Sequence, residues 1–100
     1  MRVPIPTIEL DAHGWCTVVD VIDAIIVALG GPDWHGRGWD ALHDSMVGGD
    51  INGIEPPYAI VIKNTGQSPS EVQEAVRFFV KMVGDWRTRE RAEISARFED

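Results

Sequence analysis

The chain has 100 residues, which is enough for one small domain around one hydrophobic core. It carries 16 acidic and 9 basic residues, for a formal net charge of −7 at pH 7. This surplus argues against nucleic acid and anionic membranes as direct partners, because both attract Lys and Arg. The surplus lies entirely in residues 1–60, where nine acidic residues stand against two basic ones, whereas residues 61–100 hold seven of each.

The rest of the composition is that of an ordinary globular protein, with 44% hydrophobic residues. The single cysteine, Cys16, cannot form an intrachain disulfide, so the chain needs no oxidising compartment. The sequence has no apolar run long enough to span a membrane and no signal-peptide pattern. It also lacks a phosphate-binding loop. We therefore expect a cytoplasmic, monomeric, single domain over residues 1–100 that carries no cofactor.

The first half of the chain predicts one strand and two helices. Alternating side chains indicate a strand from Ile5 to Leu10. Apolar residues at three- and four-residue spacing predict a helix from residue 18 to Leu29, with Thr17 as its N-cap and Gly30-Gly31-Pro32 as its end. A second, short helix is predicted from about Gly38 to Val47, with one apolar face that contains Trp39 as a core residue.

The second half predicts two strands and one helix. Residues Tyr58 to Ile62 are nearly all apolar, which is typical of a strand covered on both faces. After a turn over residues 63–67, Ser68-Pro69 opens a helix that we expect to stop at Gly84. Residues 92–98 alternate and predict a last strand with one wet face.

The order of these elements indicates the fold class. Each crossover between consecutive strands contains at least one helix, and crossovers of that length join parallel strands. The sequence therefore predicts an α/β domain in which a three-stranded parallel sheet is packed by helices.

The three histidines and the cysteine are residue types that can bind metals or catalyse reactions. His13, His35 and His43 show no ligand spacing, and the chain contains neither HxxxH nor CxxC. Cys16 stands just before an apolar helix, where we expect a buried and unreactive thiol. We predict no metal site and no catalytic residue.

Asp40 and Asp44 lie one turn apart on the second predicted helix and repel each other slightly. They could form a solvated helix face, an acid–base pair or part of a protein interface. Trp34 stands in the Gly-rich turn just before this helix, and a tryptophan beside two carboxylates favours an interface.

At this segment the sequence resembles the barstar family, the cytoplasmic inhibitors of secreted bacterial ribonucleases. The resemblance covers about fifteen consecutive positions, which read Pro32-Asp33-Trp34-His35-Gly36-Arg37-Gly38-Trp39-Asp40-Ala41-Leu42-His43-Asp44-Ser45-Met46. The order of the predicted elements agrees over most of the chain. The resemblance implies a three-stranded parallel sheet packed by helices, and an acidic helix that plugs the phosphate-binding cleft of a nuclease.

The resemblance also implies roles for individual residues. Asp44 would mimic a phosphate group among the basic side chains of the enzyme, and Asp40 would flank it. Trp34 would pack on the rim of the cleft. His43 would replace an interface tryptophan, and Gly48 would lie at the helix end that touches the enzyme.

Other positions depart from the family pattern. His35 stands for a tyrosine in the same partner-binding stretch, and Phe79 aligns with a position where the family carries an acidic residue. The basic residues Arg87, Arg89 and Arg91 follow the last predicted helix and are interpreted as solubilising.

The sequence thus favours an intracellular inhibitor of a basic nuclease toxin that is not itself an enzyme. One alternative is a non-inhibitory acidic module that binds a basic regulator or scaffold. Another is a small hydrolase or metal protein that uses Asp40, Asp44, His35 and His43.

Overall fold

The computed structural model describes residues 4–100 and confirms the predicted α/β fold class and order of elements. The strands form one parallel sheet in the order β1-β2-β3. The elements are β1 (Thr7–Asp11), α1 (Val18–Ala28), α2 (Trp39–Val47), β2 (Tyr58–Lys63), the 3-10 turn η1 (Thr65–Gln67), α3 (Ser70–Arg89) and β3 (Ile94–Phe98).

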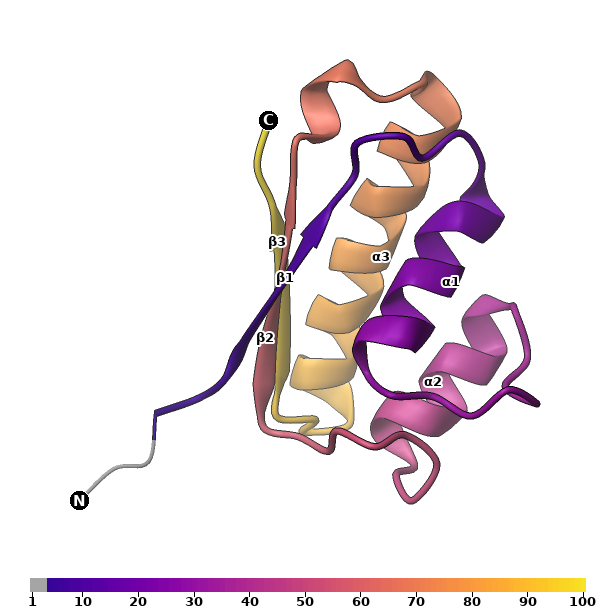
Figure 1. Ribbon diagram of the computed structural model, residues 1–100. Coiled ribbons are helices and arrows are strands. Elements are labelled where there is room, and N and C mark those ends of the chain that lie inside the picture. The colour runs from indigo at the N-terminus through magenta and orange to yellow at the C-terminus, as the bar shows by residue number, and fades with distance from the viewer. Residues whose placement is uncertain (1–3) are drawn as a thin grey trace.

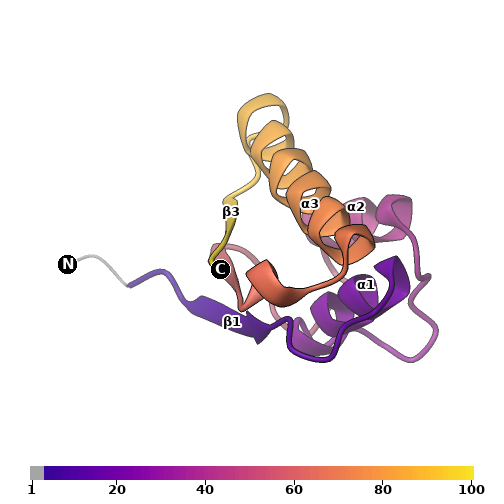
Figure 2. The same ribbon diagram turned by 90° about the horizontal axis from the view of Figure 1, so that it is seen from above.

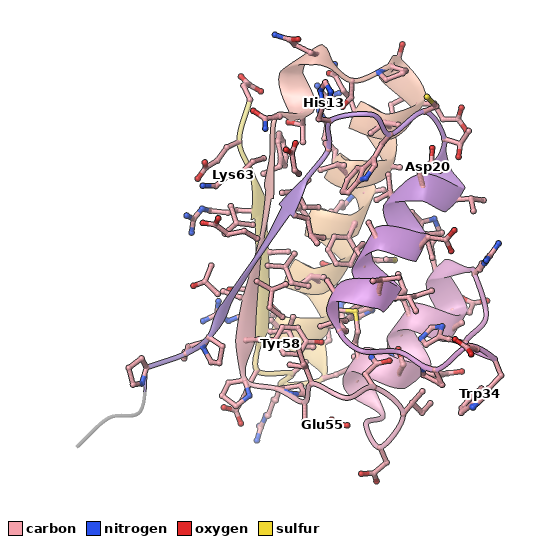
Figure 3. The ribbon with its side chains drawn as sticks, in the orientation of Figure 1. His13, Asp20, Trp34, Glu55, Tyr58 and Lys63 are labelled. Atoms are coloured by element: carbon pink, nitrogen blue, oxygen red, sulfur yellow. The ribbon has the colours of Figure 1, made fainter. Side chains whose placement is uncertain are left out.

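All three helices lie on the same side of the sheet, as both ribbon views show (Figures 1 and 2). The sequence predicts β2 as a strand covered on both faces, and four of its six residues are buried even though the helices lie on one face only. Val61 on the other face is nevertheless only 1% exposed, because the register places Glu9 of β1 and Arg97 of β3 on either side of it. On that open face Lys63 points away from the helices and pairs with Glu9 at 3.2 Å (Figure 3).

The outer strands are shorter at their starts than the pattern predicts. β1 begins at Thr7 instead of Ile5, because Pro6 has no N–H and contributes only its carbonyl, which accepts from the Ala59 N–H at 2.9 Å. β3 begins at Ile94 instead of residue 92. Ile94 is buried at 1% exposure whereas Phe98 at the far end is 37% exposed, so only the first part of β3 enters the core.

Helix α1 is closed at its N-terminus by a capping box. Thr17, the predicted N-cap, accepts from the Asp20 backbone N–H at 3.3 Å, and the Asp20 carboxylate accepts from the N–H groups of Thr17 and Cys16 at 3.0 and 2.8 Å. These hydrogen bonds lower the pKa of Asp20, the bond from the Cys16 N–H most of all. The helix ends at Ala28, and Gly30 adopts the left-handed conformation at φ +71°.

Helix α3 runs to Arg89, so the predicted stop at Gly84 is wrong. Val83 and Trp86 are buried on either side of Gly84, and their apolar contacts outweigh the roughly 1 kcal/mol that a glycine costs inside a helix. Glu90 is the C-cap of the helix, and Arg91 takes the left-handed conformation at φ +56°. Arg87 and Arg89 consequently belong to the last turn of α3, where positive charge complements the helix dipole.

The core lies between the sheet and the helices. It contains apolar residues from every long element, and Tyr58 and Phe79 are its largest fully buried side chains. Burial raises the pKa of the Tyr58 hydroxyl. Trp39 is half-buried and packs on α3, with ring centroids 5.4 Å from Phe78 and 6.2 Å from Phe79. These contacts attach the first turn of α2 to α3.

Candidate functional site

The candidate site is built on α2 and on the loop over residues 30–38 that precedes it. The N-cap of this helix is Gly38, which offers no side chain to the first turn. Leu42 and Met46 are 0% and 1% exposed and fix the helix to the core. Asp40 and Asp44 lie on the outward side and are exposed, as their spacing predicts.

Trp34 projects from the loop into solvent and is 74% exposed (Figure 3). Its neighbours include Asp44, whose side chain is 78% exposed. Between them lies a shallow hollow of about 120 Å³, lined by Trp34, His35, Gly36, Ala41, Asp44 and Ile51. Pockets for small-molecule ligands measure roughly 300–1,000 Å³, so this hollow suits a single protruding side chain better than a free ligand.

His43 connects α2 to the C-terminal end of α3. Its Nε2 donates to the Glu90 carboxylate at 2.7 Å, and its Nδ1 lies 3.8 Å from the Asp44 carboxylate. The ring meets that of Trp86 edge to face, at 5.2 Å between centroids. Glu90 therefore extends the acidic surface of α2 onto α3.

Glu90 was missed by the sequence analysis. It is 47 positions from His43, and the expected helix stop at Gly84 placed it in a loop. The available signal was the apolar spacing from Val83 to Trp86, which continues the helix past the glycine. Phe79, aligned with a family acid, is fully buried in the core. Glu90, at the C-cap of α3, is instead the carboxylate that is hydrogen-bonded to His43 of α2.

His35 is buried, with 8% of its surface exposed. Its ring bonds to the Gly36 carbonyl at 2.7 Å and to the Ser45 hydroxyl at 2.8 Å. The structure thus separates the two histidines of this segment, since His43 faces α3 and His35 faces the inside of the loop.

At two glycines of the site the backbone lies close to other atoms of the chain. A Cβ on Gly36 would lie 3.0 Å from the Ala41 Cβ, a contact so tight that the loop and α2 would have to move apart by a few tenths of an ångström. A Cβ on Gly48 would collide with the carbonyl oxygen of Asp44. The Gly48 N–H donates to that same carbonyl at 3.0 Å, which closes the helix directly below the candidate carboxylate.

Cys16 directly precedes the N-cap of α1 and is not part of the α2 site. Cys16 is exposed, so the prediction of a buried thiol is wrong; its backbone N–H serves the α1 cap instead. Within residues 4–100, no group of three or more His, Cys, Asp or Glu side chains is arranged to hold a metal ion. No helix in that part of the chain is long and apolar enough to cross a membrane.

A larger hollow of about 530 Å³ lies where the strands end, lined in part by Asp11, His13 and Asn64. Asp11 accepts hydrogen bonds from the Asn64 amide and the His13 N–H, both at 2.9 Å, and the Asn64 bond is the main reason that its pKa is lowered. Figure 3 shows His13 at the opposite end of the molecule from Trp34, so this hollow is separate from the α2 site.

Comparison with known proteins points to one family. The family model described as Barstar (barnase inhibitor) matches residues 5–99, which is nearly the whole chain. No curated protein matches the sequence.

Proposed function

The chain belongs to the barstar family, and from this premise we propose that it is an intracellular inhibitor of a basic ribonuclease or a related nuclease toxin. In this proposal α2 and the preceding loop cover the active site of the enzyme. Asp44 takes the place of an RNA phosphate, Asp40 flanks it, and Trp34 packs on the rim. His43 takes the place of an interface tryptophan, and Gly48 lies at the helix end that touches the enzyme.

The main support for the proposal is that Asp44 and Trp34 are both exposed and line the same hollow. A large indole and a carboxylate face the solvent there, while Leu42 and Met46 on the opposite side of α2 are buried. Burial of an aromatic side chain stabilises a complex by roughly 1.5–3 kcal/mol, and aromatic and charged groups in combination dominate many interfaces. The hollow between them gives a partner a place to insert a side chain.

The net charge supports the same partner. An enzyme that binds RNA has a cleft lined with basic groups, and the acidic surplus of residues 1–60 attracts such a cleft from a distance. Attraction of this kind raises association rates, which benefits an inhibitor that must act before its target does. The attraction weakens as salt is added.

The test is a titration of the purified chain against barnase and other small basic bacterial ribonucleases, with RNA cleavage as the readout. We expect cleavage to stop at one inhibitor per enzyme. Asp44→Ala should raise the concentration needed by at least tenfold and Asp40→Ala by less. Glu74→Ala is the matched control, because Glu74 is an exposed carboxylate near the other end of α3.

Two results would contradict the proposal. If Asp40→Ala and Asp44→Ala inhibit as well as the parent chain, α2 is not the inhibitory element. If a nuclease is bound but keeps its activity, the chain is a non-inhibitory acidic interaction module with the same fold.

A further inference from the structure

We propose that His35 is a positioning residue, which through its buried hydrogen bond to Ser45 fixes the loop that carries Trp34 and so shapes the hollow beside Asp44. That the hollow serves to bind a partner rests on the proposed function. That the His35–Ser45 bond fixes the loop can be tested on the free chain. In this role His35 differs from Trp34 and Asp44, which would touch the partner directly.

The hydrogen bonds of His35 join two segments of the site. The Gly36 carbonyl can only accept, so Nδ1 carries a proton and donates to it at 2.7 Å. Nε2 lies 2.8 Å from the hydroxyl of Ser45, ten residues further along and in the last turn of α2. Ser45 is 1% exposed, so water does not compete for this bond.

The start of the loop is held by backbone hydrogen bonds, from the Gly31 N–H to the Ile26 carbonyl at 2.8 Å and from the Gly53 N–H to the Gly30 carbonyl at 3.0 Å, and neither bond reaches α2. Trp34 is exposed and cannot anchor the loop. The ion pair between Arg37 and Asp23 of α1, at 3.1 Å, is exposed, and such pairs contribute roughly 0–1 kcal/mol. The His35 N–H also donates to the Pro32 carbonyl at 3.0 Å, but this bond lies within the loop and does not connect it to α2. The bond to Ser45 makes that connection.

The residues next to His35 and Ser45 in the sequence show which groups the hydrogen bond positions. Trp34 and Gly36 flank His35, and Asp44 precedes Ser45. Trp34, Gly36 and Asp44 line the same hollow. A bond between His35 and Ser45 therefore sets the distance between the indole and the carboxylate, which are the two groups offered to a partner.

The experiment labels the chain with 5-fluorotryptophan, which gives one fluorine resonance for each of its four tryptophans. Trp34→Phe identifies the resonance of Trp34. We expect Ser45→Ala to shift and broaden that resonance and to leave those of Trp15 and Trp86 unchanged.

Two substitutions at His35 separate its hydrogen bonds. The amide nitrogen of His35→Gln extends as far as Nε2 and can reach Ser45, so we expect the Trp34 resonance to stay near its original position. The shorter His35→Asn can replace only the bond to the Gly36 carbonyl, so we expect the same change as in Ser45→Ala. A residue that only adds stability would not distinguish these two variants.

Thr65→Val is the matched control. Thr65 is 3% exposed, and its hydroxyl donates to the Glu99 carbonyl at 3.0 Å, so the variant also loses one buried hydrogen bond, but far from α2. It should leave the Trp34 resonance in place. The proposal is overturned if Ser45→Ala leaves that resonance unchanged, if all four resonances move together, or if His35→Gln behaves as His35→Asn does. Failure to inhibit any ribonuclease would count against the proposed function and would not alter this result.

Discussion

Helices α1 and α2 are consecutive in the chain and pack beside each other (Figure 1). They differ in how their acidic side chains are used. In α1 the polar residues of the first turn bond to the helix itself, through the capping box of Thr17 and Asp20. In α2 the N-cap is a glycine without a side-chain bond, and its two carboxylates face the solvent.

This difference indicates which carboxylates stabilise the fold and which are available to a partner. The Asp20 carboxylate accepts two backbone N–H groups, whereas among residues 4–100 the partner of the Asp44 carboxylate is the more distant His43 ring at 3.8 Å. An acidic residue that is not used inside its own chain retains its full capacity for hydrogen bonds from another protein. The same residue type therefore serves stability in one helix and, we propose, recognition in the next.

The largest effect is expected from Asp44→Ala. In a complex Asp44 would be desolvated against basic groups, and loss of one partner of a buried ion pair costs roughly 3–5 kcal/mol. The free energy of unfolding should change by no more than about 0.5 kcal/mol, because the side chain is exposed in the free chain. Calorimetric titration with an inhibited ribonuclease and urea unfolding measure the two quantities. A stability loss as large as the affinity loss would remove the contrast with α1.

Leu42→Ala tests how α2 is held. Leu42 is 0% exposed, and truncation of a buried leucine lowers the free energy of unfolding by about 2–5 kcal/mol. Val27→Ala on α1 is the control, since Val27 is 77% exposed and its loss should have almost no effect. Urea unfolding of both variants measures the difference. Equal effects would mean that the buried face of α2 does not anchor it.

Much of the fold was predictable because it depends on local pattern. The apolar spacing of α1, the N-cap at Thr17 and the alternation in β3 are visible within short windows, and the helix-containing crossovers then require parallel strands. The stop at Gly84 failed because a glycine inside a helix is tolerated when tertiary contacts such as that of Trp86 continue on both sides. Propensity is weaker than packing at such positions.

Only those features of the site that depend on the spacing of residues within α2 were predictable. The exposure of Asp40 and Asp44 follows from their position opposite Leu42 and Met46. The burial of His35 and the contact between His43 and Glu90 depend on how the loop and the end of α3 are folded onto α2, and no short-range pattern encodes either. Covering of the sheet on one face only is likewise a property of the whole topology, which the apolar run around Val61 does not reveal.

Thr17→Ala should affect α1 alone. The variant removes the side chain that accepts from the Asp20 N–H, and loss of an N-cap lowers the free energy of unfolding by about 1 kcal/mol. The affinity for a ribonuclease should remain unchanged, because Thr17 lies outside the α2 site. An affinity loss in this variant would show that the two helices are coupled.

The contribution of Asp20 should depend on pH. Its folded pKa is below its ordinary value, because the N–H groups of Cys16 and Thr17 stabilise the carboxylate. The stabilisation is complete above the unfolded pKa of about 3.9 and is lost as the pH falls through the lower folded pKa. Asp20→Asn should therefore be less stable than the parent at pH 7, and the two should approach each other at low pH. A difference that stays constant between pH 7 and pH 2 would contradict this explanation.

The smallest effect is expected from Gly38→Ser, which would give α2 the kind of cap that α1 already has. Gly38 has φ −136° and ψ 166°, which any residue can adopt, and a Cβ there meets no atom within 4 Å. A serine hydroxyl can accept from a free N–H of the first turn, so the free energy of unfolding should rise by a few tenths of a kcal/mol. Urea unfolding measures this gain, with Gly38→Ala as the control that adds a Cβ but no acceptor. If the serine variant gains stability without any loss of affinity, the missing cap is not required for recognition; if it loses affinity, the glycine keeps space that the partner occupies next to Asp40.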